Sequence, residues 1–201
     1  MLAGLVLAGG GSSRMGGLPK AALQAPCGRS FAGRIIDVLA ESGVNNLVVV
    51  TGDHHDAVVA AVHADSPQKL PAFVRNPNPA RGQLSSLWVG MDHAINADVQ
   101  ALLVTLVDVP MITVEVVRQV IDGWRATGAP IVRPAIGDLH GHPVLYDRSL
   151  FAALRSASLE QGAKSVVRAH ESEILNVPVT DPGCLRDVDT PQDYEDLGRS
   201  S

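Results

Sequence analysis

A glycine-rich segment near the N-terminus, LVLAGGGSSRMGGLPK from Leu5 to Lys20, carries the residue types that bind phosphate groups. Glycines let backbone N–H groups approach an anion closely, and Arg14 and Lys20 supply positive charge. The dinucleotide pattern G-x-G-x-x-G is excluded because Arg14 stands where the third glycine belongs. The P-loop pattern is excluded because Gly17, not lysine, follows Gly16. We therefore predict a polyphosphate-binding loop of another kind.

Two aspartates are candidates for a metal site. Asp108 follows the apolar run 101–107, and Asp189 lies in the segment DVDTPQDY near the C-terminus. In an open parallel sheet, ligands bind beyond the carboxyl ends of the strands, and Mg²⁺ binds through one or two carboxylates together with substrate phosphates. The alternative for Asp108 is a carboxylate that starts an exposed turn. For Asp189 the alternative is favourable negative charge beside a helix N-terminus that Thr190 already caps.

The elements that would position these residues alternate between strand and helix. Strands are predicted over residues 5–7, 47–50, 72–75 and 101–107. The intervening helices are predicted over 31–42, from within 53–56 to Val62, from an N-cap at Ser85 or Ser86 to about 95, and from an N-cap at Thr113 to about 124. This alternation predicts an α/β fold with a doubly wound, mostly parallel sheet and helices on both faces.

The remainder of the chain has a less regular pattern. We predict strands at 131–133, 144–146 and 174–179, short helices at 149–156 and 163–169, and a loop over 137–143. Thr190 followed by Pro191 predicts the start of a closing helix, because proline is favoured at the first helical position. No repeat or linker divides the chain, so we predict one domain over residues 1–201.

Composition narrows the class of protein. The 201 residues are 46% hydrophobic and 18% charged, which is sufficient for a full core. A net charge of −5 argues against binding to nucleic acid or to an anionic membrane surface. Cys27 and Cys184 lack zinc-site spacing and are interpreted as reduced cysteines of a cytoplasmic protein. The apolar start Met1–Leu7 has no preceding basic region and is interpreted as a strand, not a signal segment.

The pattern L-A-G-G-x-S-x-R-M-G-x-x-x-K, from Leu7 to Lys20, resembles the opening signature of the molybdenum cofactor nucleotidyltransferases. That family has a Rossmann-like fold and transfers a nucleotide from GTP or CTP to molybdopterin. The resemblance implies that Arg14 and Lys20 bind the phosphates and act in catalysis. It also implies nucleotide contacts from the rest of the loop, namely Leu7, Ala8, Gly9, Gly10, Gly11, Ser12 and Ser13. Asp108, followed by Val-Pro, is similar to the family's metal-binding aspartate, and Asp189 to a second aspartate that joins the metal site.

Two further segments resemble those of the family. NPNPARGQLSSL, residues 76–87, is similar to a segment that contacts base and ribose, which implies nucleotide contacts from Asn76, Ser85 and Ser86. A structural role is the alternative for each, because a serine can cap a helix and Asn-Pro favours a turn. The sequence GHPV at 141–144 resembles a segment of the cytidylyl branch that borders the acceptor pocket, and it makes His142 a candidate for acceptor binding.

The resemblance implies a reaction in which an acceptor phosphate attacks the α-phosphorus of a nucleoside triphosphate and pyrophosphate leaves. Arg14, Lys20 and Asp108 would be the catalytic residues and Mg²⁺ the cofactor, with residues 1–110 binding nucleotide and 111–201 binding acceptor. A molybdoenzyme or a delivery protein is the implied protein partner. The base stays open, because Ala8-Gly9-Gly10 resembles the guanylyl branch and the second half resembles the cytidylyl branch. Two alternatives are a transferase for a sugar or polyol phosphate, which Pro19 before Lys20 favours, and a catalytically silent nucleotide-binding or cofactor-delivery protein.

Overall fold

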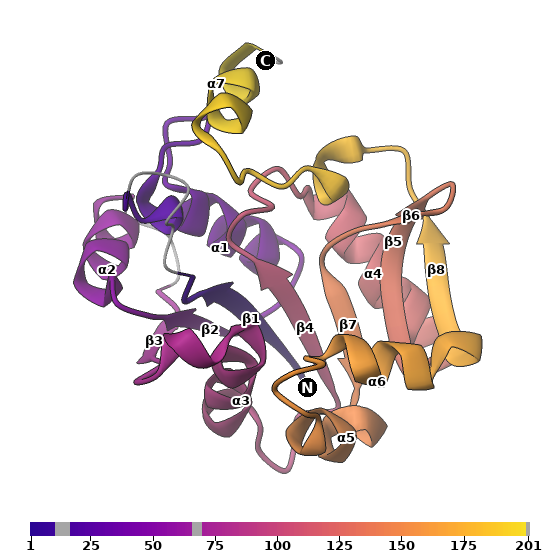
Figure 1. Ribbon diagram of the computed structural model, residues 1–201. Coiled ribbons are helices and arrows are strands. Elements are labelled where there is room, and N and C mark those ends of the chain that lie inside the picture. Colours follow the sequence, from indigo (N-terminus) through magenta and orange to yellow (C-terminus); the bar gives the residue numbers. More distant parts are fainter. Residues whose placement is uncertain (11–16, 66–69, 200–201) are drawn as a thin grey trace.

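The computed structural model describes residues 1–10, 17–65 and 70–199, and these form a three-layer α/β domain around one sheet (Figure 1). Gly11, Ser12, Ser13 and Arg14 lie outside the described residues. The strands follow the order β3-β2-β1-β4-β7-β5-β6, with β8 paired to β5. Their bounds are β1 Leu2–Ala8, β2 Asn46–Thr51, β3 Ala72–Arg75, β4 Ala101–Leu106, β5 Ile131–Ile136, β6 Leu139–His140, β7 Val144–Asp147 and β8 Ile174–Pro178.

The strand directions divide the sheet into two parts. From β3 to β4 all neighbours are parallel, whereas β7 runs antiparallel to both β4 and β5. The predicted mostly parallel α/β fold is confirmed. The loop expected over residues 137–143 contains a strand that the sequence did not indicate, because β6 forms a short hairpin with β5 through the pairs Ala135–His140 and Ile136–Leu139.

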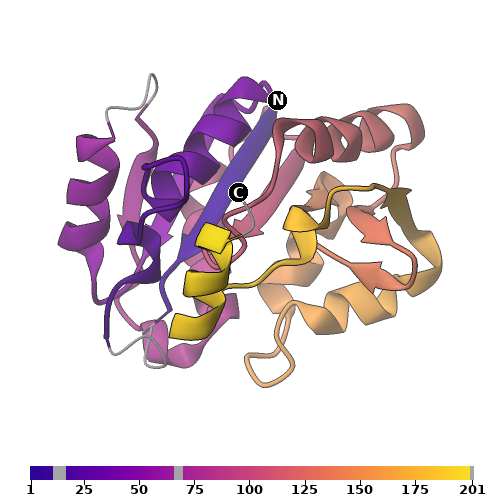
Figure 2. The ribbon, with the colours of Figure 1, turned by 90° about the horizontal axis from the view of Figure 1, so that it is seen from above.

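Helices cover both faces of the sheet, as the two views in Figures 1 and 2 show. Helices α1 (Phe31–Glu41), α2 (His55–Ala64) and α4 (Val114–Thr127) pack on one face, and α3 (Gln83–Ala94), α5 (Phe151–Ser156) and α6 (Lys164–Ala169) on the other. Helix α7 (Pro191–Arg199) closes the chain. No helix among the described residues is long and apolar enough to cross a membrane.

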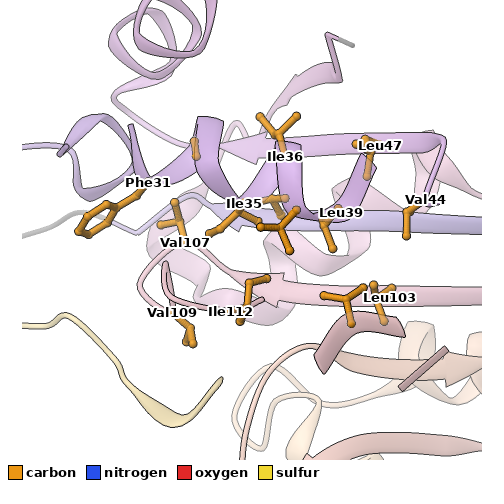
Figure 3. Close-up of a cluster of buried hydrophobic side chains, with 14 of the residues drawn as sticks. Phe31, Ile35, Ile36, Leu39, Val44, Leu47, Leu103, Val107, Val109 and Ile112 are labelled. Carbon is orange, nitrogen blue, oxygen red and sulfur yellow. The ribbon is translucent and has the colours of Figure 1, made fainter. Parts of the chain in front are cut away.

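The core on the α1 side fixes the position of the segment that follows β4. Phe31, Ile35 and Leu39 of α1 are fully buried and lie over β4 and residues 107–112 (Figure 3). Burying one such side chain contributes about 1.5–3 kcal/mol. Because Val107, Val109 and Ile112 belong to the same apolar cluster, Asp108 is placed on a packed, well-defined backbone.

Residues close in the chain set the start of helices α1 and α3, and the residue that caps α3 differs from the predicted one. Ser30 caps α1, its hydroxyl accepting a hydrogen bond from Gly33 N at 2.9 Å. Helix α3 begins at Gln83, so the prediction that Ser85 or Ser86 is its N-cap is wrong. The N-cap is Gly82, whose φ of +90° favours glycine. Both serines lie in the first turn, and a buried asparagine holds their hydroxyls.

The start of α7 agrees with the prediction. Thr190 and Asp193 form a reciprocal cap in which Thr190 N donates to Asp193 Oδ2 at 2.7 Å and Asp193 N donates to Thr190 Oγ1 at 3.2 Å. Thr113 is likewise the N-cap residue of α4. Its hydroxyl is buried and makes no capping hydrogen bond within the described part of the chain, so the helix start was predicted correctly but its capping contact was not.

Candidate active site

A cavity of about 330 Å³ opens at the carboxyl ends of β1 and β4. Ligands bind at this position in open parallel sheets because the loops that follow neighbouring strands converge there. The lining comes from the end of β1 and the loop after it, the start of α2, the turn before α3, the end of β4 and the C-terminal segment. These residues are Leu7, Ala8, Gly9, Gly10, Pro19, Lys20, Ala21, His54, Val58, Pro79, Gly82, Gln83, Ser86, Leu106, Val107, Asp108 and Asp189.

The structure brings together three of the charged residues that the sequence predicted. Lys20 Nζ donates a hydrogen bond to Asp189 Oδ1 at 2.5 Å and lies 3.9 Å from Asp108 Oδ2. The Lys20 side chain is only 13% exposed, against 29% for Asp108 and 42% for Asp189. Asp108 and Asp189 are therefore linked through one ammonium group, at the mouth of a cavity of suitable size for a nucleotide.

The environment of Asp108 disfavours its charge. Burial raises the pKa of the Asp108 carboxyl, the neighbouring Lys20 ammonium lowers it, and Asp187 and Asp189 raise it again. Its Oδ1 atom is buried and has no hydrogen-bond partner among the described residues. Buried polar atoms are normally partnered, so this oxygen is available to a ligand.

The aspartates fit a hard divalent cation. Carboxylate oxygens are preferred ligands of Mg²⁺ and Mn²⁺, and the unpartnered Asp108 Oδ1 provides one that no protein group uses in the described structure. Within residues 1–10, 17–65 and 70–199, no three His, Cys, Asp or Glu side chains are grouped to hold a metal. The protein would therefore supply the two carboxylates, and phosphate and water would complete the coordination shell.

Three contacts fix the backbone around Asp108. Val188 N donates to Asp108 O at 2.7 Å, which ties the C-terminal segment to the end of β4. Arg34 of α1 donates from Nη1 to Pro110 O and Ile112 O at 2.7 and 2.8 Å. Because charged donors make strong hydrogen bonds, this clamp holds the turn that follows Asp108.

Close backbone packing explains two glycines at the cavity. A Cβ on Gly52, after β2, would lie 2.5 Å from Gly9 O, and a Cβ on Gly9 would lie 2.8 Å from Ser86 Oγ. Both distances are too short for any side chain. The loops after β1 and β2 therefore meet through their main chains, and they leave Gly9 and Gly10 facing the cavity.

Asn76, which was predicted to contact the nucleotide, holds the hydroxyls of two serines in the first turn of α3. Asn76 is 2% exposed, and its Nδ2 donates to Ser85 Oγ at 2.9 Å and Ser86 Oγ at 3.0 Å. Its Oδ1 accepts from Asn78 N. Of these residues Ser86 is among those that line the cavity, whereas Asn76 and Ser85 are not among the described lining residues. Direct nucleotide contact by Asn76 and Ser85 stays a prediction.

A second cavity, of about 220 Å³, adjoins the first and shares Leu7, Gln83 and Leu106 with it. His142 lines it, with Nδ1 buried and without a partner among the described residues. Burial lowers the pKa of His142 to about 4, so the imidazole is neutral near pH 7. The other lining residues are Leu84, Leu87, Val104, Val144, Tyr146, Leu159, Glu160, Gln161, Gly162, Ala163 and Lys164.

Sequence reasoning missed two polar residues of the first cavity, His54 and Gln83. Each stands at the start of a helix, His54 as the N-cap residue of α2 and Gln83 as the first residue of α3. Polar residues at helix starts are ordinary, so His54, beside His55 and Asp56, was interpreted as part of a helix start, and Gln83 was assigned no role. Only the convergence of both helices on the carboxyl edge of the sheet indicates a functional position.

Comparison with known proteins decides the family. The model of the MobA-like NTP transferase domain matches residues 4–174. The chain belongs to this family of nucleotidyltransferases. This confirms the family resemblance that the signature from Leu7 to Lys20 indicated.

Individual relatives agree with this assignment. A probable molybdenum cofactor guanylyltransferase from Rhodopirellula baltica is 29% identical over 203 residues, covering 96% of this chain and 89% of that protein. The crystal structure of Rv0371c from Mycobacterium tuberculosis has a TM-score of 0.83 at 26% identity and covers all of both chains. A complex of Rv0371c with manganese has a TM-score of 0.74 at 26% identity, covering 100% of this chain and 99% of that one.

Proposed function

We propose that this nucleotidyltransferase moves a nucleotide from a nucleoside triphosphate to the phosphate of molybdopterin and releases pyrophosphate, with Mg²⁺ as the metal. The observation that carries the proposal is the group of Lys20, Asp108 and Asp189 at the cavity beside the ends of β1 and β4. Lys20 is the last residue of the glycine-rich segment. GTP is the first nucleotide to test because the relatives are named guanylyltransferases. CTP is the second, since His142 lies in a GHPV segment similar to the cytidylyl branch.

The reaction requires positioning and charge neutralisation. An oxygen of the acceptor phosphate forms a bond to the α-phosphorus, and the bond from that phosphorus to the oxygen bridging to the β-phosphate breaks. Pyrophosphate takes the bonding electrons. The attacking phosphate oxygen is already ionised near neutral pH, so no strong general base is needed. This agrees with a site whose charged groups, among the described residues, include Lys20 and two carboxylates.

Each residue has a defined part in this proposal. Gly9 and Gly10 present main chain to the triphosphate, and Lys20 donates to its oxygens and stabilises charge that develops on the departing pyrophosphate. Arg14, outside the described residues, is proposed for the same task. Asp108 and Asp189 would hold the divalent cation, which neutralises phosphate charge and orients the substrate when bound. The second cavity, with His142, is proposed as the acceptor pocket.

The test is pyrophosphate release by the purified protein with Mg²⁺, molybdopterin and each of the four ribonucleoside triphosphates. We expect release with GTP or with CTP, and analysis of the product gives the corresponding molybdopterin dinucleotide. Release only when a sugar or polyol phosphate replaces molybdopterin would overturn the acceptor. Nucleotide binding without release for any acceptor would favour a silent delivery protein, and failure to bind any nucleotide would refute the proposal.

A further inference from the structure

The Lys20 ammonium lies beside two carboxylates of the candidate site. It lies between Asp108 and Asp189, which come from the end of β4 and from the segment before α7, and it touches the carboxylate of Asp189. The two partners are separated from Lys20 by 88 and 169 residues along the chain, so the contacts are made only in the folded protein. The Lys20 side chain is only 13% exposed, so most of it is enclosed by the site.

The carboxylates at this edge need that charge. Asp187 stands two residues before Asp189 and adds a third carboxylate to this segment. Without a cation, two or three acidic groups would face one another in a partly buried place, which is unfavourable. Among the described residues, Lys20 supplies compensating charge to Asp108 and Asp189.

The same ammonium is the group expected to bind the triphosphate. The phosphate oxygens of a bound triphosphate would compete with Asp189 for the three N–H donors of Lys20, so nucleotide binding weakens the contact of Lys20 with the carboxylates. A free divalent ion carries no phosphate oxygen that could bind the Lys20 ammonium. It would meet a site with two protein carboxylates, already neutralised in part by Lys20, and with no third side-chain ligand grouped there in the described ranges.

We propose that Lys20 is the resident cation of the nucleotide-free site and excludes the free divalent ion, so that metal and nucleotide enter together. This inference rests on the proposed function, because it assumes that the same site binds a metal–triphosphate complex. It assigns Lys20 a second task in addition to its phosphate contact: it makes metal binding conditional on substrate.

The test measures binding of free Mn²⁺ without any nucleotide, by the electron paramagnetic resonance signal of unbound Mn²⁺, up to millimolar concentrations. Lys20→Met keeps a side chain of similar length and removes the charge. We expect this variant to bind free Mn²⁺ roughly tenfold more tightly than the unmodified protein, since the competing charge is gone. The same substitution should weaken binding of the α,β-methylene analogues of GTP and CTP by roughly tenfold or more, because a charged phosphate donor is lost.

Two control variants distinguish the effect of the Lys20 charge on Mn²⁺ binding from a general disturbance of the fold. Lys20→Arg keeps the positive charge and should bind free Mn²⁺ within roughly threefold of the unmodified protein. Arg125→Met removes a positive charge from the exposed ion pair with Asp122 on α4 and should leave Mn²⁺ affinity unchanged. Opposite changes in Mn²⁺ and nucleotide affinity cannot come from a loosened fold, which would weaken both.

The outcomes are separable from those of the function itself. Free Mn²⁺ binding by Lys20→Met that is equal to or weaker than that of the unmodified protein overturns the inference, as does the absence of measurable binding by both. If the unmodified protein binds no nucleotide analogue, the proposed function fails, and the Mn²⁺ comparison still decides whether Lys20 occupies a cation site.

Discussion

The two adjoining cavities share a wall and differ in their chemistry. Leu7, Gln83 and Leu106 line both. In the first, Lys20 and two aspartates face the space, whereas the second contains the neutral His142, and its charged lining residues Glu160 and Lys164 are exposed to solvent. The first cavity is therefore suited to act through charge, and the second through shape and neutral hydrogen bonds.

The difference follows from how each cavity is built. The first lies where parallel strands end and where glycines bring main-chain groups together, which favours anions. The second lies beside the antiparallel strand β7 and the segment before α6, and His142 and Tyr146 line it from the β7 side. Substitutions in the two cavities should consequently affect different kinetic constants.

The largest effect is expected for Asp108→Asn, which removes the carboxylate charge from the first cavity while preserving its shape. We expect kcat to fall by about 10³-fold, with nucleotide affinity nearly unchanged, because the lost interaction acts on the reacting phosphate. The native state disfavours the ionised carboxyl, so the neutral amide should not lower the melting temperature substantially. Steady-state kinetics and thermal denaturation check this, and a loss of less than tenfold would remove Asp108 from the catalytic group.

The next effect concerns the main-chain contact between the loops after β1 and β2. Gly52→Ala forces a methyl group against Gly9 O, so we expect stability to fall by about 1–3 kcal/mol and the KM for nucleotide to rise by about tenfold. Gly10→Ala is the matched control for stability, because a Cβ there meets no described atom within 4 Å. Equal unfolding midpoints for the two variants in urea would contradict the close contact.

A smaller and more selective effect is expected in the second cavity. His142→Ala should raise the KM for the acceptor by about tenfold through loss of one hydrogen bond and of packing, and leave the KM for nucleotide unchanged. Steady-state kinetics with each substrate varied in turn measures both constants. A change confined to the nucleotide constant would assign the second cavity to the nucleotide instead.

The last prediction concerns stability and not catalysis. The buried His142 should make the free energy of unfolding depend on pH. Its pKa falls to about 4 in the folded protein from about 6.5 when unfolded, so between these values the unfolded chain binds more protons. Stability should thus rise with pH across this window, by up to about 3 kcal/mol. In His142→Asn that contribution disappears, while the carboxyl groups titrate as before. Urea unfolding of both proteins from pH 4 to pH 7 measures the difference, and parallel curves would contradict the buried, neutral imidazole.

The parts of the structure that the sequence predicted are those governed by neighbours in the chain. The run 101–107 is apolar because β4 is covered on both faces, and the Thr190 and Asp193 cap needs only four consecutive residues. The wrong N-cap for α3 shows the limit of such reasoning. The hydroxyls of both serines accept hydrogen bonds from the buried Asn76, nine and ten residues earlier in the chain. No local sequence feature distinguishes a serine that is held in this way from a serine that caps a helix.

The candidate site was predicted in its residues but not in its contacts. Lys20, Asp108 and Asp189 were recognised from residue type and from resemblance to a family. The ammonium bridge between the two acids depends on the path of the C-terminal segment, which Val188 anchors to Asp108 O. Likewise, His142 Nδ1 is buried, and residues of β7 and α3 line one cavity with His142, an arrangement that no sequence pattern specifies.

The most direct test of the account is a crystal structure of the protein with Mn²⁺ and the α,β-methylene analogue of the nucleotide that supports turnover. We predict an anomalous manganese peak within coordination distance of a carboxylate oxygen of Asp108, with Asp189 beside it. The triphosphate should lie against Gly9 and Gly10, and Lys20 should have moved from Asp189 to a phosphate oxygen. Manganese bound away from both aspartates, or the triphosphate in the cavity that contains His142, would contradict the division of labour between the two cavities.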